Sequence, residues 1–189
     1  ELEYLDGIRN VASILGKAGI RFVIIEPLAG SKIDGACFWL NSKSPVVALS
    51  LKYDRVDNFW HTLMHELDHV KHGEGMNQPI LDVDIFGGES EEKPAMEIRA
   101  NLAAAHCLVP ENEMTGFIAR INPMFSDDLI VGFAKRIHVH PGIIVGQLQN
   151  KGLIHWSFYR KRLEKIREFV TTSAITDGYG QMINDLGRD

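Results

Sequence analysis

Residues 56–73 read VDNFWHTLMHELDHVKHG and carry the clearest helical pattern in the chain. Apolar side chains recur every three or four positions, which places them on one face of a helix. These residues are Val56, Phe59, Trp60, Leu63, Met64, Leu67 and Val70. The pattern predicts a long amphipathic helix whose apolar face packs into the core of the domain.

The predicted helix has sequence signals at both ends. Asp54 can cap its N-terminus, and Asp57 follows three residues later, where an acidic side chain favours the first turn. Gly73 is the expected end, because glycine readily adopts the left-handed conformation that terminates many helices. We therefore expect the helix to begin after Asp54 and to end at Gly73.

Four of the eight histidines lie on this helix within twelve residues: His61, His65, His69 and His72. Side chains four positions apart on a helix have Cβ atoms about 5–6 Å apart, so His65 and His69 can reach one ion. Two neutral imidazoles suit Zn²⁺. Glu66 follows the first ligand directly and can accept a proton from water activated by the metal, then pass it to a leaving amine. The alternative is a histidine pair that only packs or faces solvent.

A catalytic zinc ion needs a third protein ligand and an open fourth position. The helix at 95–108 begins near Glu97, and a rigid element holds a ligand better than a flexible loop does. We therefore favour Glu97 over the acids of the loop 74–94, which is long enough to cover or shape a site. The carboxylates compared in this way are Asp82, Asp84, Glu89, Glu91, Glu92 and Glu97.

Further polar side chains are candidates for supporting the ligands or contacting a substrate. Asn101 shares a helix face with Glu97. Asp68 either orients a ligand imidazole or pairs with a neighbouring side chain at the surface. His72 is expected to support the site rather than bind the ion, because three ligands from one helix would be nearly collinear.

The group that would stabilise a developing oxyanion is not identified by any motif. Tyr53, Arg99 and His106 are the candidates, because each can donate a hydrogen bond and lies near the motif or on the second predicted helix.

The remaining pattern predicts an α+β protein. A helix at 2–17 ends before Gly19, and three short strands follow, separated by glycine- and Asn/Pro-containing turns that suggest an antiparallel meander. The expected strands are 21–26, 36–40 and 46–50, and further helices are expected at 95–108, 111–121, 126–137, 141–149 and 157–170. The expected fold is mostly helical, with a three-stranded antiparallel sheet beside the motif helix.

Composition excludes several classes of protein. The chain has 189 residues, 45% of them hydrophobic, a net charge of −5 and two cysteines, which fits a globular protein with neither a disulfide framework nor a nucleic-acid-coating surface. The acidic N-terminus is not a secretory signal, and no apolar run is long enough to span a membrane. We expect a cytoplasmic protein without a membrane partner.

Three segments resemble the ImmA/IrrE family of zinc metallopeptidases, and more closely the C-terminal region of HigA-type antitoxins. The segments read LSLKYDRVDNFWHTLMHELDHVKHG, EIRANLAAAHCLVP and FAKRIHVHPGIIVGQLQNKGLI. The resemblance implies a zincin-like domain with one zinc ion on His65, His69 and Glu97, and Glu66 as general base. Asp68 departs from the family pattern, which usually has a small residue there.

The resemblance also implies a domain organisation. The peptidase-like domain is expected to cover residues 1–170, including a helix-turn-helix-like hairpin at 133–150, and to be followed by a flexible tail at 171–189. In HigA-like relatives a DNA-binding helix-turn-helix domain precedes this region. Because the chain begins with Glu1 rather than Met, we expect that such a domain has been removed, and that any DNA contact would be made through it.

Two functions follow from these observations. The first is a zinc-dependent endopeptidase that cleaves a regulatory protein. The second is the C-terminal domain of a HigA-like antitoxin or transcriptional regulator, in which the zinc site senses or binds a toxin or repressor partner. A site in which the metal only holds the helices together would require a fourth protein ligand, such as His72 or a loop carboxylate. The residues alone leave the substrate, the oligomeric state and the choice between zinc and manganese open.

Overall fold

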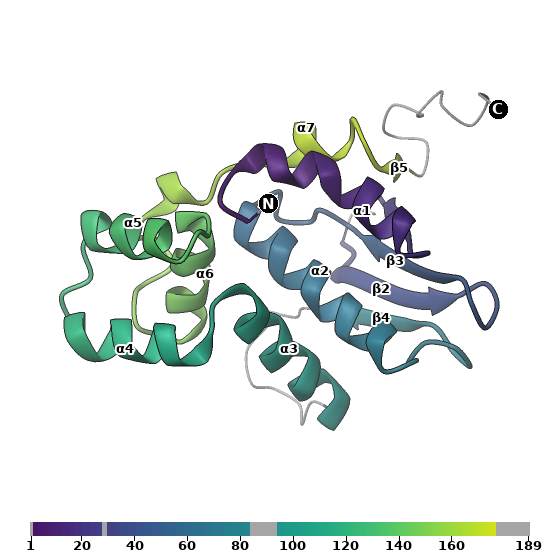
Figure 1. Cartoon of the computed structure of the whole chain (residues 1–189), viewed down its shortest axis with the longest axis horizontal. Helices are drawn as coiled ribbons and strands as arrows, with labels where there is room; N and C mark the ends of the chain where they lie inside the picture. Colours follow the sequence, from purple (N-terminus) through teal and green to yellow (C-terminus); the bar gives the residue numbers. More distant parts are fainter. Residues whose placement is uncertain (1, 28–29, 84–93, 177–189) are drawn as a thin grey trace.

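The computed structural model describes residues 2–27, 30–83 and 94–176. The described strands form a single sheet at one side of the molecule, with some helices beside the sheet and others grouped at the opposite end (Figure 1). The strands are β1 Arg21–Ile24, β2 Ile33–Trp39, β3 Pro45–Leu49, β4 Ile80–Val83 and β5 Ile175–Thr176. The α-helices are α1 Val11–Lys17, α2 Val56–Lys71, α3 Ala95–Leu108, α4 Glu111–Ile121, α5 Asp127–Arg136, α6 Pro141–Asn150 and α7 Arg167–Val170, and the 3₁₀ helices are η1 Leu5–Asn10 and η2 Arg160–Arg162. The α+β class is confirmed.

The sheet is mixed and has the strand order β4-β2-β3-β1-β5 (Figure 1). β2 pairs antiparallel with β3 and β4, whereas β1 pairs parallel with β3 and β5. The predicted three-stranded antiparallel meander is therefore wrong, because β3 lies between β1 and β2. All five residues of β3 are buried, and a continuous apolar run of this kind is typical of a strand with a parallel neighbour. β5 lies in the segment that was expected to be a flexible tail.

Helix α2 is the centre of the structure. It packs against α3, α6, β2 and β3 (Figure 1). Its apolar residues Val56, Phe59, Trp60 and Leu63 are each at most 3% exposed, and burying each such side chain contributes about 1.5–3 kcal/mol. The helix predicted from the quoted stretch is confirmed, and its packing holds the polar face of α2 in a fixed place.

The predicted cap of α2 is wrong. Arg55 is the N-cap residue and makes no capping hydrogen bond through its side chain. Asp54 has a φ of 44° and points away from α2. Its Oδ1 accepts hydrogen bonds from the backbone N–H groups of Ile166 and Arg167, at 3.0 and 2.8 Å. Asp54 therefore caps the start of α7, far along the chain, rather than the helix that it precedes.

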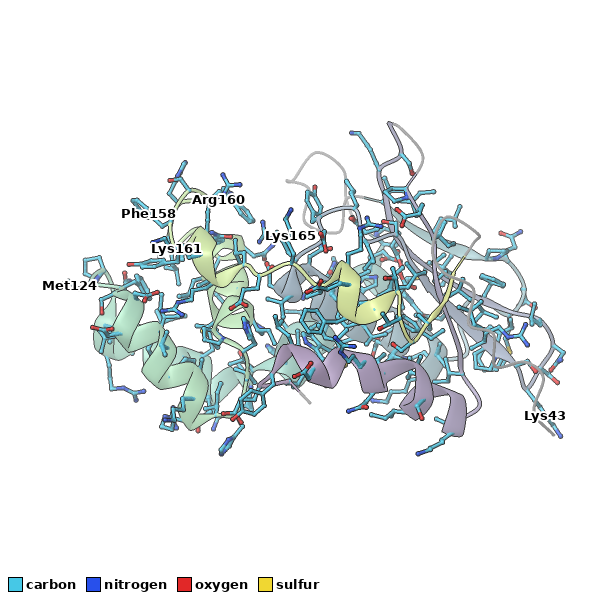
Figure 2. The ribbon with its side chains drawn as sticks, turned by 90° about the horizontal axis from the view of Figure 1, so that it is seen from above. Lys43, Met124, Phe158, Arg160, Lys161 and Lys165 are labelled. Carbon is cyan, nitrogen blue, oxygen red and sulfur yellow. The ribbon has the colours of Figure 1, made fainter. Side chains whose placement is uncertain are left out.

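The single helix predicted at 157–170 is also wrong. Gln149 donates side-chain hydrogen bonds to the carbonyl groups of Trp156 and Phe158, and Tyr159 has a left-handed backbone with a φ of 55°. These features hold the segment in turns, followed by η2 and α7. Its basic side chains still face solvent, and Figure 2 shows Phe158 and Arg160 at the outer edge of the molecule.

The helix pair α5 and α6 forms part of the same core. α6 packs against both α5 and α2, and the residues from Gly142 to Val145 are buried. Gly146 lies where α6 packs closely against α2, because a Cβ atom there would be 2.7 Å from the Asp57 Cβ. Among the described helices, none combines the length and the apolar character needed to cross a bilayer.

Replacing Gly146 with alanine should therefore destabilise the protein by about 1–3 kcal/mol, as overpacking of a core usually does. The matched control is Gly132→Ala on α5, where an added Cβ meets no atom within 4 Å. That control should stabilise the protein by up to about 1 kcal/mol, because alanine is the better helix former. Urea denaturation measures both values, and equal effects of the two substitutions would contradict the close α2–α6 contact.

Candidate metal centre

The two motif histidines point to one place inside the protein. His65 and His69 lie one turn apart on α2, and both side chains are fully buried. Their Nε2 atoms are 3.1 Å apart. The apolar face of α2 is buried in the core. Because this packing fixes the rotation of the helix, the face that carries the two histidines is also fixed. The arrangement presents two ring nitrogens to a shared point.

Helix α3 brings a carboxylate to the same point. The α3 bounds agree with the prediction, and Glu97 lies in the first turn of the helix. Glu97 Oε2 is 3.1 Å from His65 Nε2, and its Oε1 is 3.6 Å from His69 Nε2. Ala100 and Ala104 are completely buried, and their small side chains let α3 pack closely against α2.

A second carboxylate, Asp82, comes from the edge strand β4. Asp82 Oδ2 is 3.4 Å from His65 Nε2 and 3.7 Å from His69 Nε2. The sequence analysis preferred Glu97 to Asp82 because it placed Asp82 in a flexible loop. In the structure Asp82 lies on a paired strand. One donor atom from each of His65, His69, Asp82 and Glu97 lies within 4.8 Å of the others. The other acids of the predicted loop, Asp84, Glu89, Glu91 and Glu92, lie outside the described residues.

The hydrogen-bond partner of Nδ1 on each imidazole indicates which ring nitrogen carries the proton. His65 Nδ1 is 3.2 Å from Asn101 Oδ1, and His69 Nδ1 is 2.7 Å from Glu74 Oε2. Both partners are acceptors, so each Nδ1 can donate a proton to its partner, and in the neutral ring Nε2 then carries a lone pair. Both lone pairs then face the shared point, as metal coordination requires.

Glu74 is a functional residue that the sequence analysis missed. It is held by Arg99, whose guanidinium donates to both Glu74 oxygens at 3.0 and 2.6 Å and to Asp68 Oδ2 at 2.8 Å. Asp68 and Arg99 thus act on His69 through Glu74. The only sequence signal was the position of Glu74, directly after the glycine that ends α2.

Glu66 lies beside the donor cluster, close to the carboxylates of Asp82 and Glu97. Its side chain is fully buried, and neither carboxylate oxygen has a hydrogen-bond partner among the described residues. The space for it exists because Gly35 of β2 has no side chain, since a Cβ there would overlap the Glu66 carboxylate. Burial raises the pKa of Glu66 well above its usual value, and the nearby Asp82 and Glu97 carboxylates raise it further.

The cluster has the electrostatic character of a cation site. Burial alone lowers the pKa of His65, but the Asp82 and Glu97 carboxylates outweigh this effect and raise it to about 9. Burial alone raises the pKa of Glu97, but hydrogen bonds from His65 and His69 outweigh it and lower the pKa well below its usual value. Two buried carboxyl groups, Glu66 and Asp82, and the partly buried Glu97 surround the two imidazoles. Positive charge is favoured there, because an uncompensated buried charge is costly. Two imidazoles with carboxylate oxygens form a donor set that zinc accepts.

Three of the candidate residues are not part of this cluster. Tyr53 precedes α2 and lines a separate cavity of about 220 Å³ with Asn58 and Trp156. The nine residue steps from Val56 to His65 alone span about 14 Å along the helix. His106 lies near the far end of α3, 3.8 Å from Glu111. His72 donates to the Asp68 carbonyl group at 2.8 Å and is not one of the clustered donors. Tyr53 and His106 are therefore unsuited to stabilising an oxyanion at this site, and Arg99 is occupied by Glu74 and Asp68.

The fold and the donor cluster define a class of protein: an α+β domain with a buried two-histidine, two-carboxylate centre on its main helix. The model of the peptidase family described as the IrrE N-terminal-like domain matches residues 16–148. The chain belongs to this family and is a metallopeptidase-like domain. No curated protein matches the chain, and the relation to HigA-type antitoxins stays a prediction.

Zinc should stabilise the protein, because it would neutralise the buried carboxylates. At a free concentration of 100 times its Kd, zinc should add about 2.7 kcal/mol to the free energy of unfolding, and raise the Tm by about 5–10 °C. His65→Ala should abolish this shift, whereas His106→Ala should keep it. A zinc-dependent shift of the same size in His65→Ala would contradict the site.

The hydrogen bond from His69 to Glu74 should strengthen metal binding. Glu74→Gln keeps the shape of the side chain but weakens its pairing with both His69 and Arg99, so we expect zinc affinity to fall about 10–100-fold. Competition with a chromophoric chelator measures this affinity. Glu113→Gln is the matched control, because Glu113 is also paired with an arginine, Arg136, but lies on α4. An equal change in both variants would show that Glu74 has no specific role.

Proposed function

We propose that this protein is a zinc-dependent endopeptidase that cleaves peptide bonds in a protein substrate. The observation that carries the proposal is the position of Glu66, a buried carboxyl group without a described hydrogen-bond partner, beside the shared point of His65, His69 and Glu97. His65, His69 and Glu97 would hold the ion. The family membership supports the same chemistry.

Different residues of the protein would perform different parts of the reaction. Bound zinc would supply Lewis acidity, which polarises the scissile carbonyl group and makes water a better nucleophile. Glu66 would take a proton from the attacking water and deliver it to the leaving amine. Asn101 and Glu74 would hold the imidazoles in the orientation that binds the ion.

A cavity beside the cluster provides room for a substrate. Its volume is about 540 Å³, and it lies between β4 and the start of α3. Asp82, Glu97 and Asn101 line it together with the apolar side chains of Ile80 and Met96. β4 is an edge strand, so an extended peptide could pair with its backbone. A segment of an unfolded or extended protein therefore fits the cavity better than a compact small molecule does.

Replacing Glu66 with glutamine should test this mechanism. We expect zinc content to remain unchanged, because Glu66 is not a proposed ligand, and cleavage to fall at least about 100-fold, because the general base is lost. Cleavage is measured by mass spectrometry on a complex peptide mixture, with zinc-loaded protein.

Glu111→Gln serves as the control, because Glu111 is an exposed carboxylate on α4. It should cleave the mixture as the unmodified chain does. Cleavage that persists in Glu66→Gln at the unmodified rate would overturn the proposed mechanism.

A further inference from the structure

We propose that Asp82 is a fourth protein ligand of the metal, and that it keeps the resting protein latent by occupying the position that water needs. This inference rests on the proposed function, because only a hydrolytic site requires that position to be open. The sequence predicts three protein ligands and one open coordination position, whereas the structure places a fourth donor beside the other three.

The donor distances approach those of a four-coordinate zinc site: the four donors lie within 4.8 Å of one another, with Glu97 Oε2 nearest to His65 and Glu97 Oε1 nearest to His69. Four donors at about 2.0–2.1 Å from a zinc ion lie about 3.3–3.4 Å from one another. The two imidazole nitrogens are 3.1 Å apart, and His65 Nε2 lies 3.1 Å from Glu97 and 3.4 Å from Asp82. His69 Nε2 lies 3.6 Å from Glu97 and 3.7 Å from Asp82. Asp82 is therefore placed as a ligand would be, and at nearly the same distances as Glu97.

The burial of Asp82 is a second and independent observation. Asp82 is only 4% exposed, whereas its neighbours Leu81 and Val83 on β4 are 58% and 53% exposed. Asp82 Oδ2 is buried and receives no hydrogen bond from the described part of the chain. A strand at a sheet edge could present a carboxylate to water, but β4 turns this one inward. A buried carboxylate without a donor is costly, and a bound cation would offset that cost.

The backbone of the sheet fixes this orientation. Asp82 is opposite Gly35 in the antiparallel pair of β4 and β2, so both residues face the same side of the sheet. Gly35 has no side chain, and the space is shared by the carboxylates of Asp82 and Glu66. With Asp82 on the metal, Glu66 would have no water to deprotonate. Activation would require the Asp82 side chain to leave the ion; among the described residues β4 pairs with β2 alone.

Cobalt substitution tests the fourth ligand directly. The d–d absorption of Co²⁺ reports the coordination number, and acetohydroxamate reports whether a position on the ion is open. Asp82→Ala should weaken and shift the absorption, bind acetohydroxamate at least tenfold more tightly, and bind zinc at least tenfold more weakly. Asp82→Asn preserves the size of the side chain and should change the spectrum in the same direction.

The matched control is Leu81→Ala, which alters the adjacent, outward-facing residue of the same strand. It should leave the cobalt spectrum and the zinc affinity unchanged. The fourth-ligand assignment is overturned if both Asp82 variants match the unmodified chain in all three measurements.

Cleavage of the peptide mixture then tests latency. Asp82→Ala loaded with zinc should cleave at least tenfold faster than the unmodified chain. Equal or slower cleavage, together with a changed cobalt spectrum, would overturn latency while leaving ligation by Asp82 intact. A changed spectrum with no Glu66-dependent cleavage by any variant would instead contradict the proposed peptidase function, so the two failures are distinguishable.

Discussion

Two imidazole nitrogens and two carboxylates converge inside the protein, and the rest of the structure holds them there. Each of the three contributing elements is fixed by different means: α2 by its apolar face, α3 by its buried alanines, and β4 by pairing with β2. The cluster is electrostatically unfavourable without a cation, because carboxylates from separate elements are forced together at low exposure. The cluster without a cation therefore lowers the stability of the fold, and a bound metal ion would offset this electrostatic cost.

Helix α2 joins this site to the core. Its apolar residues pack on the sheet and on α6, while the histidines one turn apart face α3 and β4. Two glycines permit the close packing: Gly146 lets α6 approach near Asp57, and Gly35 leaves the space that Glu66 fills. A change in core packing would thus move the imidazoles, and a change at the site would alter the packing of α2.

Much of this arrangement could be predicted from local pattern. The periodicity of α2, α3 and α4, and the pairing of His65 with His69 on one face, depend on neighbours within one helix, and the structure agrees with the helix bounds to within a residue or two. What could not be predicted depends on contacts between distant segments. Asp54 caps α7 rather than α2, β3 separates β1 from β2, and Asp82 reaches the histidines only because β4 pairs with β2 in one register. Glu74 was missed for the same reason, since its role depends on Arg99 from another helix.

The central claim is that this buried cluster binds zinc through nitrogen and oxygen donors of the protein. X-ray absorption at the zinc edge of the loaded protein tests it most directly. The account predicts four nitrogen or oxygen neighbours at about 2.0–2.1 Å, with the multiple-scattering signature of two imidazoles and no sulfur. A shell of six oxygen neighbours without imidazole scattering, or one containing sulfur, would contradict it.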